Sequence, residues 1–488
     1  MRQQNCTSQT LDSRSFLPRP NMNQYYEGLN EKLFAAIPPS RKVLELGCAA
    51  GRLGERYKQL HTQTTWVGVD CNLEALQQAA QRLDATFQIS LDDQSLDAVG
   101  NGFDCVVMGD LLEHLKQPEK LLENLARITT ANASLACCVP NMGHVSVFER
   151  MLLGDLSYDD NGLLDRTHLR FLSCSSLFKM LLDAGWLPTL HDSYLVGHSQ
   201  PALIEKLKEA ARLLSVPPAT AERLLSTYQM VVRCKKRADV AGSSAGAPLS
   251  VVVPVTNETQ LHLDILKSPG LAELNPQVLL CRGAKSAAEA LQWGIRQSAA
   301  PWLILCHQDV YFPKGTGQAI ARSLSAVPGS DASRTILGFA GLTVKQSMDE
   351  LELAKAGLLV DRVNLFDYPE STSAISIDEF AVVLHRDCKY RIDPRLGWHL
   401  WATDLCLQAI FDEQQRTHAR VLRVPVFHNS LNDGTLPPAF YESARVLAAK
   451  YPQLGFIPTL CGNLPGLQVA PPSNPAHQAC AASAAAVL

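Results

Sequence analysis

The segment from Val43 to Gly51 constrains the fold more than any other stretch of the chain. It reads Val-Leu-Glu-Leu-Gly-Cys-Ala-Ala-Gly, so a short apolar run ends at Gly47 and a second glycine follows four residues later. Apolar residues then recur at helical spacing from Leu53 to Leu60. A buried strand, a glycine turn and a helix N-terminus together form a corner where a ligand can approach bare backbone and the positive end of a helix dipole.

Strands and helices alternate along the next hundred residues. Apolar runs predict strands over 66–70, 103–108 and 135–139, and amphipathic helices begin near Asn72 and Pro118. This alternation predicts an α/β fold with a doubly wound parallel sheet. Ligands bind such a sheet at the carboxyl ends of its strands. Gly47, Asp70, Gly109-Asp110 and Pro140-Asn141 all fall at those ends.

Two ligands compete for the glycine turn. A dinucleotide requires Gly-x-Gly-x-x-Gly to make room for a pyrophosphate, whereas Ala49 stands where the middle glycine would be. S-adenosylmethionine needs less room, and its ammonium group favours an acid such as Glu45. Asp70 lies nineteen residues beyond Gly51 and is placed to accept from the ribose hydroxyls. A tight turn without any ligand is the third interpretation.

The ordered motifs resemble class I S-adenosylmethionine-dependent methyltransferases over roughly residues 22–195. They are Glu-Leu-Gly-Cys-Ala-Ala-Gly, Val-Gly-Val-Asp, Phe-Asp-Cys-Val-Val-Met-Gly-Asp-Leu-Leu-Glu-His-Leu, Val-Pro-Asn, and Gly-Leu-Leu-Asp-Arg-Thr-His-Leu-Arg-Phe. The resemblance implies that the turn holds the methionine end of the cofactor, that Asp70 holds the ribose, and that Asp92 or Asp93 lies near the adenine. The residues that would bind S-adenosylmethionine are then Glu45, Gly47, Cys48, Ala49, Gly51, Asp70, Asp92, Asp93, Gly109 and Asp110.

Methyl transfer requires an acceptor held in line with the sulfonium and, for a hydroxyl, a base for its proton. His114 and His168 are the histidines nearest the expected pocket, with Glu113, Asp165 and Arg170 beside them. We expect His114 or His168 to be the general base. The alternatives are that His114 only shapes the pocket at a helix start, and that 165–170 is a structural turn before a helix over 175–184.

Composition divides the chain into two units. We expect a flexible arm over 1–22, the methyltransferase domain over 23–197, a helical extension over 198–237 and a small-residue linker over 238–249. A second α/β domain is expected over 250–460, beginning with a buried strand at Ser250 to Val255, and a disordered tail over 461–488.

The second unit carries its own polar positions. Trp302 to Cys306 predicts a buried strand, followed by His-Gln-Asp309-Val, then Gly-Trp-His with Asp404, and finally Phe-His428-Asn. An acid just beyond a buried strand can bind a divalent cation that neutralises a diphosphate leaving group. Over residues 250–452 this order resembles family-2-like glycosyltransferases of the GT-A fold. The resemblance implies that Asp309 and His428 hold Mg²⁺ or Mn²⁺ and that Asp404 is the base for an acceptor hydroxyl.

Three stretches depart from that pattern: Thr256-Asn257-Glu258, Cys281-Arg282-Gly283 and Gln292-Trp293-Gly294. They leave open that this unit only binds a glycan. A non-catalytic assembly protein is a further alternative, and a dehydrogenase is the most distant one. The favoured interpretation is a methyltransferase joined to a glycosyltransferase-like unit that decorates a surface polysaccharide, with a glycan or small-molecule methyl acceptor and a nucleotide sugar as partners.

Charge and cysteine content exclude several other classes. The formal net charge is -4, from 44 Lys and Arg against 48 Asp and Glu, which argues against binding to nucleic acid or an anionic membrane. The 14 cysteines are scattered without a Cys-x-x-Cys, so we expect reduced thiols in a cytoplasmic protein. No stretch approaches the ~18 apolar residues of a transmembrane helix.

Overall fold

A computed structural model describes residues 29–196, 201–237, 248–347, 350–362, 365–412, 418–432 and 434–465. The expected arm over 1–22, nearly all of the linker and most of the expected tail lie outside these ranges. The predicted disordered tail, 461–488, begins too early. Gly462–Pro465 forms strand β21, which pairs antiparallel with β20 (Phe456–Thr459). We call residues 29–237 the N-terminal half and residues 248–465 the C-terminal half.

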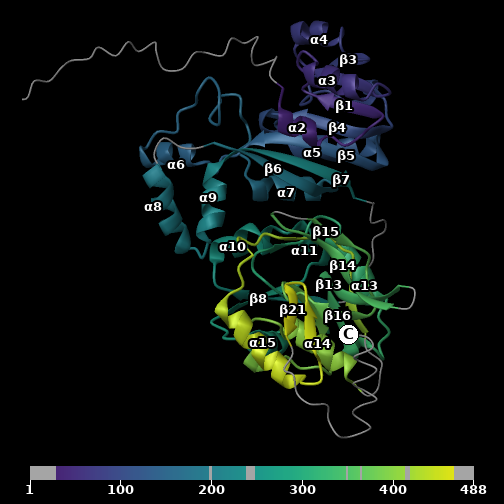
Figure 1. Ribbon diagram of the computed structural model, residues 1–488, viewed down its shortest axis with the longest axis vertical. Helices are drawn as coiled ribbons and strands as arrows, with labels where there is room; N and C mark the ends of the chain where they lie inside the picture. Colours follow the sequence, from purple (N-terminus) through teal and green to yellow (C-terminus); the bar gives the residue numbers. More distant parts are fainter. Residues whose placement is uncertain are drawn as a thin grey trace, which may run out of the picture.

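The N-terminal half contains a seven-stranded sheet in the order β3-β2-β1-β4-β5-β7-β6, with helices on both faces (Figure 1). Strands β1 to β5 are parallel, so the chain winds outward in both directions from the boundary between β1 and β4. The strands are β1 (Lys42–Leu46), β2 (Thr65–Asp70), β3 (Ala85–Gln88), β4 (Phe103–Gly109), β5 (Thr129–Pro140), β6 (Trp186–Leu195) and β7 (Thr227–Lys236). The helices are α2 (Glu31–Ala36), α3 (Arg52–Leu60), α4 (Leu73–Ala79), α5 (Pro118–Ile128), α6 (Val145–Leu152), α7 (Cys174–Asp183), α8 (Pro201–Arg212) and α9 (Pro218–Ser226).

The predicted helical extension over 198–237 is only partly correct. Helices α8 and α9 are present, but residues 227–236 form β7, which lies between β5 and β6 and runs antiparallel to both. Met230 and Val232 pack into the core on one face of the sheet, whereas Val231 packs into the core on the other. A strand that is apolar on both faces lacks the alternation that distinguishes it from a helix in sequence.

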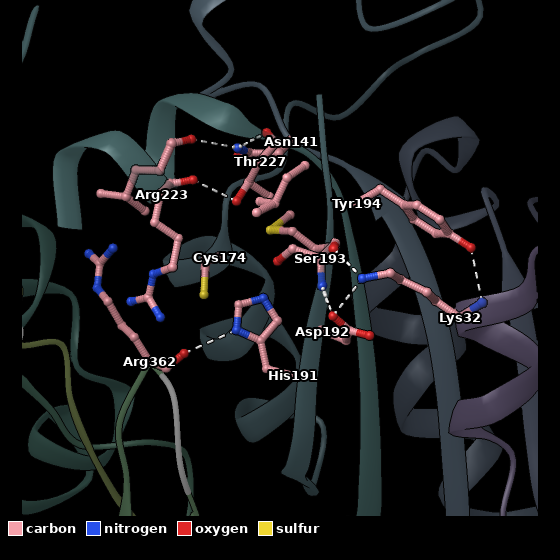
Figure 2. Close-up of a pocket in the computed structure, with 13 residues that line it drawn as sticks. Lys32, Asn141, Cys174, His191, Asp192, Ser193, Tyr194, Arg223, Thr227 and Arg362 are labelled. Atoms are coloured by element: carbon pink, nitrogen blue, oxygen red, sulfur yellow. Dashed lines mark hydrogen bonds and ion pairs between the residues drawn. The ribbon is translucent and has the colours of Figure 1, made fainter. Parts of the chain in front are cut away.

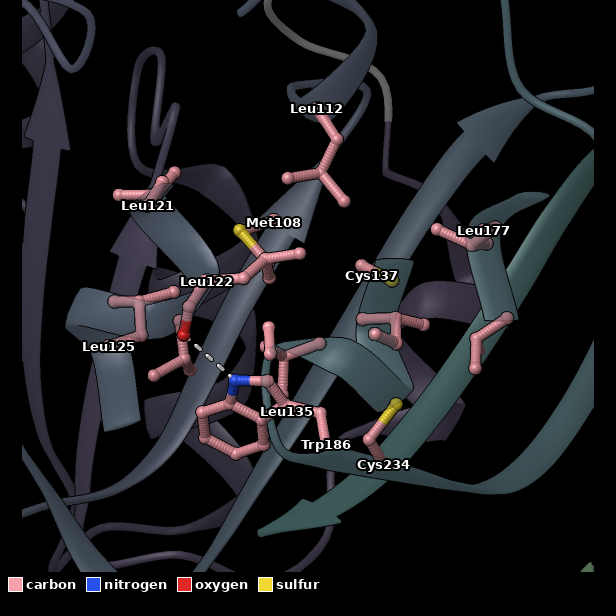
Figure 3. Packing of buried hydrophobic residues seen from close by; sticks show 14 of the residues in the cluster. Met108, Leu112, Leu121, Leu122, Leu125, Leu135, Cys137, Leu177, Trp186 and Cys234 are labelled. Carbon is pink, nitrogen blue, oxygen red and sulfur yellow. Dashed lines mark hydrogen bonds between the residues drawn. The ribbon is translucent and has the colours of Figure 1, made fainter. Parts of the chain in front are cut away.

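Leucine side chains of α5 and α7 fill one face of this sheet. The indole of Trp186 is fully buried among them, and its Nε1 donates to the carbonyl of Leu122 at 3.0 Å (Figure 3). Cys137 of β5 and Cys234 of β7 pack there as free thiols. Cys105, Cys138 and Cys306 are also buried and unpaired, in agreement with the expectation of reduced thiols.

The C-terminal half contains a six-stranded mixed sheet in the order β18-β12-β17-β10-β8-β9 and a second six-stranded sheet built around β13 and β14. The parallel neighbours β9, β8 and β10 lead to the antiparallel strand β17. The elements of the mixed sheet are β8 (Leu249–Val255), β9 (Gln277–Arg282), β10 (Trp302–Cys306), β12 (Thr335–Gly338), β17 (Ala381–His385) and β18 (His418–Val421). Those of the second sheet are β11 (Val310–Tyr311), β13 (Ala340–Ser347), β14 (Glu350–Val360), β15 (Leu365–Tyr368), β16 (Ala374–Ile377) and β19 (Val426–His428). The helices are α10 (Glu258–Leu263), α11 (Pro269–Leu274), α12 (Ala287–Gln297), α13 (Thr316–Ser325), α14 (Trp401–Ile410) and α15 (Pro438–Lys450).

The two halves share a packed contact. Phe178 of α7 lies 5.9 Å from Phe427 of β19 between ring centroids, and both rings are buried in one apolar cluster. Lys179 of α7 forms an ion pair with Asp264 at 2.7 Å, and Asp264 is fully buried. The face of the first sheet that carries α7 therefore lies against the second half (Figure 1).

Among the described residues, no helix combines the length and the apolar character needed to cross a membrane.

Candidate functional site

The glycine turn has the backbone that the sequence predicts. Gly47 and Gly51 have φ angles of 73° and 75°, in the left-handed region that favours glycine, and Gly51 is the N-cap residue of α3. Ala49 between them also has a positive φ, 45°, which costs a residue with a Cβ about 1–2 kcal/mol. The amides of Gly47 and Cys48 both donate to the carbonyl of Val69, at 2.8 and 3.0 Å. The turn is thus anchored to the end of β2.

Glu45 lies beneath this turn with its carboxyl group buried. Its Oε2 accepts a 2.8 Å hydrogen bond from Nε1 of Trp66, and the residue is 6% exposed. Burial raises the pKa of Glu45 to about 8 despite the bond from Trp66. Its suggested contact with the methionine end of the cofactor remains a prediction, since the carboxyl group already has an internal partner.

Asp70 stands at the carboxyl end of β2, beside the turn. Its Oδ2 accepts from the amide of Ala49 at 2.8 Å, and its Oδ1 accepts from the amide of Asn72 at 2.9 Å. Asn72 in turn caps α4, because its side chain accepts from the amide of Ala75. Asp70 therefore ties the glycine turn to the start of α4.

The remaining predicted cofactor residues surround the same edge. Asp110 follows β4 with a φ of 46°, and its Oδ1 accepts from Nε2 of Gln229 at 2.6 Å. Burial raises the pKa of Asp110, although the bond from Gln229 opposes this effect. A Cβ at Gly109 would lie 3.0 Å from Leu33 of α2. Asp92 accepts from the amide of Lys116 at 2.8 Å, whereas Asp93 is bonded to the hydroxyl of Ser90 at 3.1 Å.

The structure brings Glu113, His114 and His168 together. Glu113 and His114 belong to a short 3-10 helix (Leu112–His114) directly after β4, and His168 belongs to the loop after α6. The imidazole centroids lie 4.9 Å apart, and one potential ligand atom of each of the three residues lies within 4.8 Å of the others. Burial, and then His168, lowers the pKa of His114. Both predicted base candidates are therefore present at one place.

A cavity of about 560 Å³ lies elsewhere, where β6, α9 and the C-terminal half meet. Arg223 of α9 and Arg362 of the C-terminal half lie side by side in it, and Nδ1 of His191 is bonded to the carbonyl of Arg362 at 3.1 Å (Figure 2). Asn141, predicted at a strand end, also lines this cavity, but its side-chain amide donates to the carbonyl of Thr227 at 2.7 Å. None of the residues that form the glycine turn lines it.

The second candidate site follows β10. His428 of β19 approaches Asp309 with 3.5 Å between Nε2 and Oδ1, and its ring stacks on Phe380 at 5.2 Å. Burial works to raise the pKa of Asp309, but His428 and His307 outweigh it and lower that pKa. One potential metal-ligand atom from each of His307, Asp309 and His428 lies within 4.8 Å of the other two. His307 was missed from sequence, although its position two residues before Asp309 at a strand end was the available signal.

Asp404 is not placed to act as a base, and this prediction is wrong. It lies in α14 with no exposed surface. Its Oδ2 accepts from Lys450 at 2.7 Å and from Gln408 at 2.8 Å, and its Oδ1 accepts from the hydroxyl of Tyr451 at 2.8 Å. A carboxylate held by three donors inside the core joins α14 to α15 and cannot reach an acceptor hydroxyl.

The departures from the glycosyltransferase pattern have local structural reasons. Arg282, the last residue of β9, forms a two-pronged ion pair with Glu258, at 2.7 and 3.0 Å. Gln308 accepts from the amides of Thr256 and Asn257, both at 2.8 Å, and so joins the loops after β8 and β10. At Gly294 a Cβ would lie 2.3 Å from the side chain of Val252. These positions therefore pack loops and helix α12 onto the sheet.

Comparison with known proteins identifies a methyltransferase family in the N-terminal half. A family model described as a methyltransferase domain matches residues 19–189. No curated protein matches the chain. Among solved structures, the chain is similar to the putative methyltransferase in a complex with the Trm112 methyltransferase activator from Haloferax volcanii, at 16% identity over 45% of this chain and 91% of that one, with a TM-score of 0.31. It is also similar to a SAM-dependent methyltransferase from Archaeoglobus fulgidus (15% identity, 44% and 98% covered, TM-score 0.31). A third is the N-methyltransferase NodS from Bradyrhizobium japonicum in complex with S-adenosyl-L-homocysteine (13% identity, 42% and 83% covered, TM-score 0.27).

Proposed function

We propose that this chain, whose N-terminal half contains a class I S-adenosylmethionine-dependent methyltransferase domain, methylates a hydroxyl group of a glycan or a related acceptor. The observation that carries the proposal is the arrangement at one sheet edge of the glycine turn, Asp70 and the group Glu113, His114 and His168. In the reaction the acceptor oxygen loses its proton and attacks the methyl carbon. The carbon–sulfur bond breaks, its electron pair stays on sulfur, and S-adenosylhomocysteine leaves.

Asp70 can hold the turn and bind the cofactor at the same time. A carboxylate offers about four lone-pair positions, and the amides of Ala49 and Asn72 occupy one on each oxygen. The remaining positions are available to two ribose hydroxyls. Gly47 places no side chain between the turn and the expected methionine end of the cofactor, whereas a Cβ at Gly51 would lie 3.1 Å from Ala79 and Leu83, so that glycine allows close packing behind the turn.

His114 or His168 is the proposed general base. Nδ1 of His114 lies 3.2 Å from the carbonyl of Thr167, and Nδ1 of His168 lies 3.0 Å from the carbonyl of Leu163. Because a carbonyl only accepts, both Nδ1 atoms carry the proton and both Nε2 atoms keep a lone pair in the neutral rings. If His114→Ala and His168→Ala both retain full transfer with an unchanged pH profile, this role is refuted.

The cofactor assignment is tested by binding to the full chain. We expect titration calorimetry to detect S-adenosylhomocysteine binding to wild type and a loss of roughly tenfold or more in Asp70→Ala, since two charge-assisted hydrogen bonds are removed. The matched control is Asp97→Ala, which removes an exposed acid from the same half. Absence of binding to the wild-type protein would refute the proposal.

A second activity, glycosyl transfer from a nucleotide sugar, is favoured by the group His307, Asp309 and His428. These residues lie together after a strand of a mixed α/β sheet, and imidazole with carboxylate can hold Mn²⁺ opposite a diphosphate. We expect release of nucleoside diphosphate with Mn²⁺, and its loss in Asp309→Ala but not in the exposed control Asp387→Ala. Glycan binding without nucleotide-sugar turnover would instead support a non-catalytic unit.

In this proposal the chain has two functional units that build or modify a surface polysaccharide. The first unit extends to residue 237, since β7 belongs to its sheet, and the second begins at Leu249 with β8. The contact between them through Phe178 and Phe427 would keep the two sites in one body.

A further inference from the structure

We propose that Glu113, His114 and His168 form a binding site for a divalent transition-metal cation in the methyltransferase half. The site is separate from the one around Asp309, which belongs to the other half. Its binding of metal does not depend on the proposed methyl transfer, whereas its use in catalysis rests on that function.

The polypeptide holds the three side chains together from two distant segments. The carbonyl of Glu113 accepts from the amides of Leu169 and Arg170, at 2.8 and 3.0 Å. Arg170 also donates from its guanidinium to the carbonyl of Lys116. The loop that carries His168 is thereby fixed to the short helix that carries Glu113 and His114. The result is a group of three potential ligand atoms within 4.8 Å of one another.

Both histidines already have the tautomer that a metal requires. Their Nδ1 atoms donate to the backbone carbonyls of Thr167 and Leu163, which leaves each Nε2 as a lone-pair donor. Metal-binding histidines characteristically use their second nitrogen in this way, because the outer hydrogen bond orients the ring and raises its basicity. The two carbonyls therefore serve as the outer partners of the site.

Glu113 supplies the independent observation. It is 1% exposed, and within the described part of the chain neither Oε1 nor Oε2 has a hydrogen-bond partner. Burial of a carboxyl group without partners is strongly unfavourable unless a cation or a proton compensates its charge. No lysine or arginine side chain is paired with it in the described residues. A metal ion bound to the adjacent imidazoles would provide that compensation.

The ligand set indicates the kind of metal. Two imidazoles and one carboxylate suit Zn²⁺, Mn²⁺ or Fe²⁺, whereas Mg²⁺ and Ca²⁺ prefer oxygen ligands. Three protein ligands leave coordination positions for water and for an acceptor hydroxyl. Such a hydroxyl would lose its proton to solvent more easily, and its oxygen would then attack the methyl carbon as the carbon–sulfur bond breaks. With a metal bound to Nε2 of both histidines, neither ring could act as the free base, so the metal would activate the hydroxyl in place of a histidine.

The site lies next to the cofactor turn. A Cβ at Gly47 would contact Leu111, at 3.5 Å, and Leu111 directly precedes the short helix of Glu113 and His114. Asp110 lies on the same connection, three residues before Glu113. A cation here would therefore stand beside the expected methyl donor.

The experiment measures Mn²⁺ and Zn²⁺ binding to the full chain by calorimetry and, for Mn²⁺, by electron paramagnetic resonance. An Asp309→Ala/His428→Ala background removes the other candidate site. We expect one ion per chain in that background, and at least about tenfold weaker binding after adding Glu113→Gln or, separately, His114→Ala. His262→Ala, which removes an exposed histidine, is the matched control and should leave binding unchanged. Far-ultraviolet circular dichroism verifies that each variant is folded.

The outcomes separate this inference from the proposed function. Metal affinity unchanged by both Glu113→Gln and His114→Ala overturns the inference. Full methyl transfer after removal of all metal by a chelator overturns the catalytic use while leaving the cofactor assignment intact. Retained, Glu113-dependent metal binding in a protein that fails to bind S-adenosylhomocysteine would support the metal site and refute the methyltransferase proposal.

Discussion

Glu45 is an acid inside a core that otherwise consists of apolar and aromatic side chains. Its hydrogen-bond donor is Trp66, and the ring of Trp66 lies 5.1 Å from that of Tyr57. One neutral donor does not offset the loss of water, so burial dominates and raises the pKa from 4.5 to about 8. Near neutral pH the folded protein therefore holds a proton here that the unfolded chain has released.

Replacing Glu45 with glutamine tests this proton. In the wild type the unfolded state binds fewer protons than the folded state between the two pKa values, 4.5 and about 8, so stability falls as pH rises through this window. Glu45→Gln keeps an acceptor for Trp66 and does not titrate. We expect denaturant titrations to show the variant gaining on the order of 3 kcal/mol relative to wild type from about pH 5 to about pH 8.

Glu74→Gln is the control, because Glu74 is exposed on α4 and should show no such difference. A stability difference between Glu45→Gln and wild type that does not change with pH would contradict the assignment of the proton to Glu45.

At the scale of elements, two glycines allow α3 and the glycine turn to pack closely against β2. Gly54 is inside the helix, and a Cβ there would lie 2.5 Å from Leu83 and 2.6 Å from Trp66. A similar closeness occurs at Gly68 of β2, where a Cβ would lie 2.7 Å from the sulfur of Cys48. Because these glycines allow the close approach, the turn at residues 47–51 is held directly over the strand ends.

Gly54→Ala has two opposing effects on the free energy of unfolding, and their sizes can be compared. Alanine favours an interior helix position by about 1 kcal/mol over glycine. An added methyl group in a filled core costs about 1–3 kcal/mol, and the short distances to Leu83 and Trp66 put this site toward the upper end. We expect a net loss of about 1–2 kcal/mol in denaturant unfolding, with a change in Trp66 fluorescence. Gln77→Ala at an exposed position of α4 should be neutral, and a more stable Gly54→Ala would refute the packing argument.

At the scale of the whole molecule, the contact between the halves includes a buried ion pair. The carboxylate of Asp264 forms an ion pair with Lys179 at 2.7 Å and accepts a hydrogen bond from the side-chain amide of Asn429 at 3.0 Å. The centre of the Tyr311 ring lies 5.0 Å from the ammonium nitrogen of Lys179. Burial raises the pKa of Asp264, while Lys179 works to lower it. The pair lies beside the Phe178–Phe427 contact, so its loss should weaken the attachment of one half to the other.

Lys179→Ala leaves Asp264 buried without its cation, and we expect a loss of about 3 kcal/mol. Because the pair joins the halves, calorimetric unfolding should also change from one transition toward two. Lys179→Met combined with Asp264→Asn removes both charges and should restore much of the loss. The control is Lys314→Ala, which removes an exposed pair with Glu123 across the same junction and should cost under about 1 kcal/mol. Equal effects of Lys179→Ala and Lys314→Ala would contradict the argument.

Local patterns were sufficient for the central parallel strands of the first sheet and for the glycine turn. The apolar run to Gly47, the helical spacing from Leu53 and the acid at Asp70 each depend on a few neighbouring residues, so the sequence alone determined the strand, the turn and the cap. The spacing of the turn also distinguished S-adenosylmethionine from a dinucleotide. The strand over residues 227–236 was not predicted, because a strand that is buried on both faces shows no alternation of apolar and polar residues.

Contacts between distant segments decided the rest. His114 and His168 come together only because the loop of Leu169 bonds to the carbonyl of Glu113. His307 joins His428 through the pairing of β11 with β19, which is long-range and has no local signature. Asp404 has the residue type of a base, yet helix packing surrounds it with donors from the end of α15 and from Tyr451 just beyond it. The sequence by itself therefore determined the first strands and the glycine turn, whereas tertiary packing decided which acids and histidines are buried or brought together, because burial and long-range pairing depend on the whole fold.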